Sequence, residues 1–160
     1  PCGFFGDSSS GRECHCTQAE IARYLGRISG PLTDRIDIHI EVPPVSYDKL
    51  TADAQGESSL EIKKRVDRAR EVQMTRYRDE GIFYNDQLTS RLMHRYCTLS
   101  RDAKLMLKEA FDVLNLSARA YSRILKVSRT IADLERSKLI KEEHIGEAIQ
   151  YRSLDRKYWL

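Results

Sequence analysis

The chain has 160 residues, of which 32% are charged and 41% are apolar. This composition is typical of one globular domain with a charged surface, and it excludes a mainly disordered chain. The net charge of +3 permits contact with nucleic acid but does not require it. No apolar run reaches the ~18–20 residues of a membrane span, and no signal peptide is recognisable.

The first part of the chain predicts loops around one short helix and one strand. Residues 1–16 are rich in Gly, Ser and Cys, and residues 18–27 carry a short helical pattern that Gly30-Pro31 interrupts. Residues 36–42 alternate apolar and polar side chains, which predicts the clearest strand in the chain. A single strand needs partners, so we expect its sheet to be completed by preceding sequence and the chain to be a piece of a longer protein.

A long charged helix is predicted next. Ser58 and Glu61 have the spacing of a capping box, and Gly81 ends the pattern that runs to about Arg78. The expected inward face of this helix consists of Ile62, Val66, Ala69 and Val72.

Further helices are predicted over 88–96, after Ser100, after Ser117 and over 141–152. Their apolar residues recur at spacings of three and four. The inward positions are Ala103, Leu107, Ala110 and Leu114 in the second, Ala120, Ile124, Val127, Ile131 and Leu134 in the third, and Ile145, Ala148 and Ile149 in the last. The predicted fold class is therefore mainly α. Residues 1–50 would be the end of an α/β core, and residues 51–160 a helical bundle.

Two arginines stand where they could bind phosphate. Arg35 directly precedes the predicted strand, and a planar guanidinium can clamp phosphate oxygens with two hydrogen bonds. Spacing alone equally fits a surface arginine paired with Asp34 or Asp37. Arg119 falls in the first turn of the helix after Ser117, where the helix N-terminus already favours an anion.

The segment around Arg119 is locally basic. Between Ser117 and Lys138, six basic residues face two acidic ones. Arg119, Arg123 and Lys126 also share one helical face, so a solvated basic surface is the alternative to a phosphate contact.

The four cysteines favour a reducing, cytoplasmic setting, because three crowd the first sixteen residues and Cys97 stands alone. Cys2, Cys14 and Cys16 have the short spacings that suit Zn²⁺, although three thiolates are an incomplete set. Free thiols in an exposed loop are the favoured alternative for this chain. Cys97 lies among Leu92, Met93 and Leu99, which predicts a core thiol.

Two motifs in combination resemble magnesium-chelatase-like AAA+ ATPases, and within them the ComM-type competence family. They are Pro-Leu-Thr-Asp-Arg-Ile-Asp at 31–37 and Leu-Ser-Ala-Arg-Ala-Tyr at 116–121. The resemblance covers nearly the whole chain. It implies that 1–50 ends a nucleotide-binding core and that 51–160 is the helical lid.

The resemblance also implies roles for the site residues. Arg35 would be the arginine finger that reaches ATP in a neighbouring subunit, and Arg119 would be the sensor-2 arginine. The family's cysteine motifs imply a four-cysteine zinc site in the parent protein, of which Cys2, Cys14 and Cys16 would be three ligands. ATP and Mg²⁺ would be the parent's cofactors, and a homo-oligomeric ring, most simply a hexamer, its assembly.

The chain contains no Gly-x-x-x-x-Gly-Lys-(Ser/Thr) phosphate loop. We therefore expect it to be inactive alone, although its parent would hydrolyse ATP. DNA branch migration or helicase action during natural transformation is the expected work. The alternatives are a magnesium chelatase subunit, a stand-alone helical module that binds nucleic acid, and an adaptor bundle without a ligand.

Overall fold

The structure is a computed structural model that describes residues 14–42, 45, 47, 51 and 56–152. The chain divides into two compact units. Residues up to Gly56 belong to the first unit, and Glu57–Arg152 form the second.

The first unit contains two short helices, α1 (Gln18–Leu25) and α2 (Gly30–Thr33). Thr17 caps α1 in a capping box: its hydroxyl accepts from the Glu20 amide at 3.3 Å, and the Glu20 carboxylate accepts from the Thr17 amide at 2.8 Å. The Gly30-Pro31 pair opens α2. Proline is tolerated there because the N–H group that it lacks would have no hydrogen-bond partner in the first turn of a helix. No residue of α1 is buried, so local signals alone define this helix.

Residues 36–42 form no strand, contrary to the prediction. Four alternate side chains have exposed fractions between 43% and 81%: Ile36, Ile38, Ile40 and Val42. A strand requires ladder hydrogen bonds to a neighbour, and within the described ranges no segment pairs with this one. The alternating pattern is present, but the partner that would turn it into a strand is not among the described residues.

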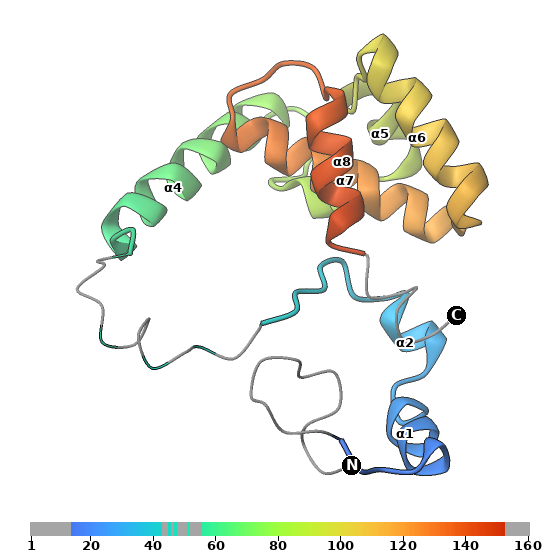
Figure 1. The fold of residues 1–160 in the computed structure, drawn as a ribbon. Coiled ribbons are helices and arrows are strands. Elements are labelled where there is room, and N and C mark those ends of the chain that lie inside the picture. Colours follow the sequence, from blue (N-terminus) through green and yellow to red (C-terminus); the bar gives the residue numbers. More distant parts are fainter. Residues whose placement is uncertain (1–13, 43–44, 46, 48–50, 52–55, 153–160) are drawn as a thin grey trace. The chain divides into compact units, whose positions relative to one another are not determined.

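The second unit is a bundle of helices, which confirms the mainly α prediction. Its elements are α4 (Ser59–Arg76), the 3₁₀ turn η1 (Asn85–Gln87), α5 (Ser90–Tyr96), α6 (Arg101–Leu114), α7 (Ala118–Leu134) and α8 (Glu142–Gln150). The helix α7 packs against α4, α5 and α8, and α8 also packs against α6 (Figure 1). Each predicted cap is present: Ser58, Ser100 and Ser117 accept from the amide three residues on.

The core of the bundle surrounds α7 and α8. Ile124, Ile140 and Ile145 are each at most 1% exposed, and Ala103 and Leu107 of α6 close the same cluster. Burying an aliphatic side chain of this size contributes about 1.5–3 kcal/mol, so these residues supply the main stabilisation of the second unit.

The helix α4 buries only part of the predicted face. Ile62, Val66 and Val72 are 37–42% exposed, whereas Ala69 and Gln73 are buried. Where α4 meets η1, the contact is polar: Gln73 Oε1 accepts from the Asn85 amide at 3.2 Å. The apolar periodicity therefore placed Ala69 correctly, but it placed Ile62, Val66 and Val72 incorrectly.

A short clasp joins the segments that lead into α6 and α8. Ser100 donates its amide to the Ile140 carbonyl at 2.8 Å, and Ile140 donates to the Thr98 carbonyl at 2.9 Å. These bonds form an isolated parallel bridge between Leu99 and Ile140. None of the helices in the described residues has the length and apolar character needed to cross a membrane.

Candidate functional site

Arg35 lies at the surface of the first unit, just after α2. Its amide donates to the Leu32 carbonyl at 3.0 Å, and its Nη1 donates to the Pro31 carbonyl at 2.9 Å. The side chain is exposed. The short α2 turn therefore holds the guanidinium near the surface.

Arg119 occupies the first turn of α7. Asn115, at a φ of 46°, turns the chain out of α6, and the Ser117 hydroxyl caps α7 by accepting from the Ala120 amide at 3.0 Å. Arg119 is exposed, and no acidic residue stands in this turn. The partial positive charge of the helix N-terminus and the guanidinium thus reinforce each other as a site for an anion.

The two arginines belong to different units, and each is described within its own. Their predicted roles, finger for Arg35 and sensor for Arg119, both remain predictions. What the structure adds is local: each residue is exposed, and each follows a turn fixed by backbone hydrogen bonds.

The cysteine cluster is only partly described. Cys2 lies outside the described residues, whereas Cys14 and Cys16 are partly exposed and form no disulfide. Throughout the described ranges, the one group of three close metal-ligand atoms consists of Glu135, Glu143 and His144, and neither thiol belongs to it. The two described thiols do not make a zinc site by themselves, so no chemistry is assigned to a metal here.

Cys97 is buried, as predicted for a core thiol. Burial raises the pKa of this thiol to about 11. A thiol that stays protonated at neutral pH is a poor nucleophile and a poor metal ligand, so Cys97 is a packing residue.

A buried charge network went unpredicted. The Asp133 carboxylate, with a fully buried side chain, accepts from Arg76 Nη1 at 2.9 Å and from Arg129 Nε at 3.1 Å. Asn85 Nδ2 also donates to it at 3.0 Å, and the Tyr77 hydroxyl donates to Asn85 Oδ1 at 2.6 Å. The network links α4, η1 and α7.

Arg129 is part of this network and is 1% exposed. Its Nη1 donates to the Lys138 carbonyl at 2.9 Å, which anchors the loop after α7. Burial lowers the pKa of Arg129, and the charge of Asp133 opposes this effect. The i, i+4 spacing of Arg129 and Asp133 was the sequence signal that could have revealed the pair.

The Arg76 guanidinium has the opposite balance. Burial acts to lower the pKa of Arg76, but the hydrogen bonds and charges of Asp133 and Tyr77 together outweigh burial and raise that pKa above its ordinary value. Both arginines therefore stay charged against one carboxylate, and the network carries a net positive charge.

Comparisons with known proteins match two family models in sequence order. The model for magnesium chelatase, subunit ChlI, matches residues 1–50, and the model for the ChlI C-terminal region matches residues 56–152.

Curated relatives show the same similarity. The uncharacterized protein YifB of Salmonella typhimurium is 41% identical over 91% of this chain and 28% of its own length. The competence protein ComM of Haemophilus influenzae is 43% identical over 86% of the chain and 26% of its own length. The uncharacterized protein Rv2897c of Mycobacterium tuberculosis is 33% identical over 88% and 28%. The chain thus spans little more than a quarter of the length of these relatives.

Proposed function

Since this chain belongs to the magnesium chelatase ChlI family, in its ComM-type branch, we propose that it is the C-terminal part of an AAA+ ATPase. In this proposal residues 1–50 end the nucleotide-binding core and residues 51–160 form the helical lid. The two family matches support this boundary, because the first ends at residue 50 and the second begins at residue 56.

The exposed Arg119 at the capped N-terminus of α7 carries the proposal. A terminal phosphate is an anion, and it is stabilised both by the helix dipole and by a guanidinium beside it. We assign Arg119 to the sensor-2 role, in which it contacts the γ-phosphate of ATP.

Arg35 is assigned to the arginine finger. Such a residue stabilises the negative charge that develops on the transferred phosphoryl group. It acts across a subunit boundary, so the protein that contains this chain would assemble as a homo-oligomeric ring, most simply a hexamer. ATP with Mg²⁺ is its proposed cofactor, and the Mg²⁺ would neutralise phosphate charge during transfer.

The proposed work of the ATPase is remodelling of DNA, as branch migration or helicase action. Similarity to a relative named competence protein supports this choice. The proposed location is the cytoplasm, which fits the unoxidised cysteines among the described residues. A magnesium chelatase subunit is the second candidate, supported by the family models themselves. The two candidates are distinguished by measuring whether ATP turnover is stimulated by DNA or depends on a porphyrin.

The test compares Arg35→Ala and Arg119→Ala in the longer protein that contains this chain. Arg35→Ala is expected to lower ATP turnover by about 10³-fold or more while ATP binding persists, because the finger acts mainly in the transition state. Arg119→Ala is expected to slow hydrolysis and to weaken ATP binding by about tenfold, equivalent to about 1.4 kcal/mol.

Arg101→Ala is the matched control, because Arg101 is an exposed arginine at the first position of α6. Turnover is measured by phosphate release and ATP binding by a fluorescent ATP analogue. Wild-type turnover in Arg35→Ala would remove the finger assignment, and wild-type binding and turnover in Arg119→Ala would remove the sensor assignment.

A further inference from the structure

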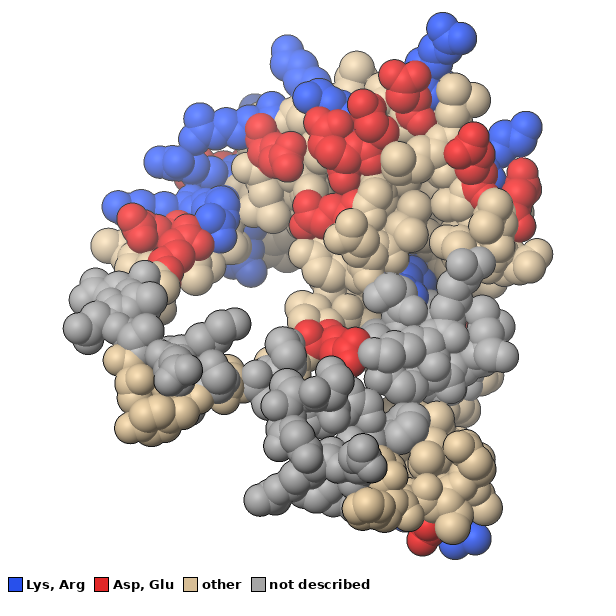
Figure 2. All heavy atoms as spheres, in the orientation of Figure 1, with Lys and Arg blue, Asp and Glu red and all other residues tan. Residues whose placement is uncertain are grey.

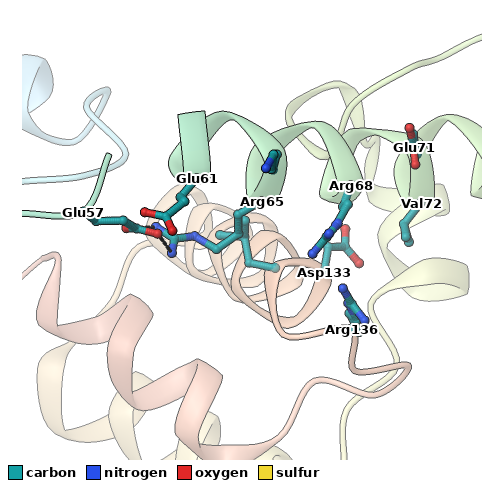
Figure 3. A pocket seen from close by; sticks show the side chains of 10 residues that line it. Glu57, Glu61, Arg65, Arg68, Glu71, Val72, Asp133 and Arg136 are labelled. Carbon is teal, nitrogen blue, oxygen red and sulfur yellow. Dashed lines mark hydrogen bonds and ion pairs between the residues drawn. The ribbon is translucent and has the colours of Figure 1, made fainter. Parts of the chain in front are cut away.

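A groove of about 750 Å³ lies between the first turns of α4 and the end of α7 (Figure 3). It belongs entirely to the second unit and lies away from the first turn of α7. Its lining is charged almost throughout: Lys64, Arg65, Arg68 and Arg136 face Glu57, Glu61, Glu71 and Asp133, with Val72 and Leu134 beside them.

Three of the four carboxylates in the groove are already engaged by the fold. Glu57 accepts two hydrogen bonds from Arg65, at 2.7 and 3.0 Å. Glu61 accepts from the Ser58 amide and hydroxyl in the capping box of α4. Asp133 is shared by the partly buried Arg76 and the buried Arg129, so its charge is more than neutralised.

Most of the basic side chains of the groove differ from these carboxylates in having no bonding partner among the described residues. Within the described part of the chain, the side chains of Lys64, Arg68 and Arg136 make no hydrogen bond or ion pair, and all three residues are exposed. Arg68 and Arg136 come from α4 and from the end of α7, and both extend toward the space between these helices (Figure 3). Their three charges exceed the two of Glu61 and Glu71, the lining carboxylates that form no ion pair with any described arginine, so the groove keeps a net positive charge.

The backbone at Arg136 is a second, independent observation. Arg136 has a φ of 61°, in the left-handed region where glycine is the usual residue. It closes α7 in a Schellman motif, since Ser137 donates to the Ala132 carbonyl at 2.8 Å and Arg136 donates to the Asp133 carbonyl at 3.1 Å. An arginine is strained in this conformation. Its position at the end of α7 brings its charge to the groove.

Basic side chains continue from the groove along α4. The helix carries six basic residues against three acidic ones, and Lys and Arg gather along it in Figure 2. Lys64 and Arg68 are one helical turn apart and therefore share a face. A row of cations suits a chain of phosphates better than a single small anion.

We propose that this groove binds the phosphate backbone of DNA, with Lys64, Arg68 and Arg136 as the contacting residues. The guanidinium groups would donate paired hydrogen bonds to phosphate oxygens, and the contacts would carry no base specificity. The inference depends on the proposed action on DNA, but it uses residues that are separate from Arg35 and Arg119.

The test uses the longer protein with the paired substitutions Arg68→Gln and Arg136→Gly, and a labelled mixed-sequence DNA duplex. DNA affinity at physiological salt is expected to fall by about tenfold, and the slope of log affinity against log salt to shrink by about 2, because each phosphate contact contributes about 1. Arg91→Gln with Arg101→Gln removes the same charge from exposed positions on α5 and α6 and is expected to leave both values near wild type.

The single variant Arg136→Gly separates binding from folding. It removes a cation and also relieves the left-handed strain, so we expect weaker DNA binding together with a higher melting temperature. Equal DNA affinity in the groove variants and the wild type would overturn the proposal, as would an equal loss in the control pair. Loss of binding to a polyglutamate peptide, with DNA affinity retained, would assign the groove to an acidic protein segment and would also overturn it.

ATP turnover without DNA is measured in parallel and is expected to stay at the wild-type level in the groove variants. If Arg35→Ala and Arg119→Ala instead leave turnover unchanged, the finger and sensor assignments fail while the DNA measurement on the groove can still be read.

Discussion

The two units of this chain differ in what holds them together. In the second unit, α4 to α8 surround a core in which several side chains are entirely buried. In the described residues of the first unit, α1 buries nothing, and the apolar side chains at 36–42 are exposed. Capping and turn signals suffice to start a helix. An apolar face is buried only where another element packs against it.

The substitution with the largest expected effect on stability tests whether the second unit depends on its buried charge network. Asp133→Ala would leave Arg76 and Arg129 without their shared carboxylate in a buried place. We expect the free energy of unfolding to fall by about 3–5 kcal/mol, the usual cost of breaking a buried ion pair from one side. Urea denaturation followed by circular dichroism measures it.

Asp67→Ala is the control for this substitution. Asp67 pairs with Lys63 on the exposed side of α4, where both side chains contact solvent. Such a pair contributes at most about 0.5 kcal/mol. Equal effects of the two substitutions would mean that burial does not distinguish the Asp133 network.

The next effect compares one isoleucine from each unit. Ile145→Ala removes a side chain that is 0% exposed in the core and is expected to destabilise the protein by roughly 3 kcal/mol through lost burial and a cavity. Ile38→Ala changes a side chain that is 46% exposed, and less than about 0.5 kcal/mol is expected. A large loss for Ile38→Ala in the longer protein would show that a sheet buries this residue there.

The smallest effect concerns pH. Burial raises the pKa of the Cys97 thiol from an ordinary 9.0 to about 11, so the folded state holds its proton more tightly than the unfolded state does. The resulting stabilisation is complete below about pH 9 and is lost as the pH rises from 9 to 11.

Unfolding free energies of the wild type and Cys97→Ala are compared at several pH values across this window. The difference between them is expected to shrink by roughly 2 kcal/mol. Cys14→Ala is the control, because its partly exposed thiol belongs to the other unit. A constant difference between wild type and Cys97→Ala would show that the thiol does not titrate differently in the folded state.

Sequence reasoning was most successful where a single local interaction decides the structure. Ser58, Ser100 and Ser117 were identified as caps because a hydroxyl three residues before an amide is enough to start a helix. The inward positions Ala103, Leu107 and Ile124 followed from the helical period of α6 and α7.

The misses all involve distant partners. In α4, Ala69 is buried as predicted, but Ile62, Val66 and Val72 are exposed. Polar contacts to η1 and α7 hold the C-terminal part of this helix, and the apolar period contains no trace of them. The strand was wrong because pairing requires a neighbour. Arg35 and Arg119 are exposed, and their roles as finger and sensor stay predictions, since a phosphate contact is not a local property of either turn.

The Leu99–Ile140 clasp ties together two segments that are distant in the sequence. It joins the residues just before α6 to the loop that leads from α7 into α8. Its two backbone hydrogen bonds therefore fix the start of α6 beside the start of α8, two helices that also pack against each other. Because each bond joins an N–H group to a carbonyl of the main chain, this connection does not depend on which side chains the two segments carry.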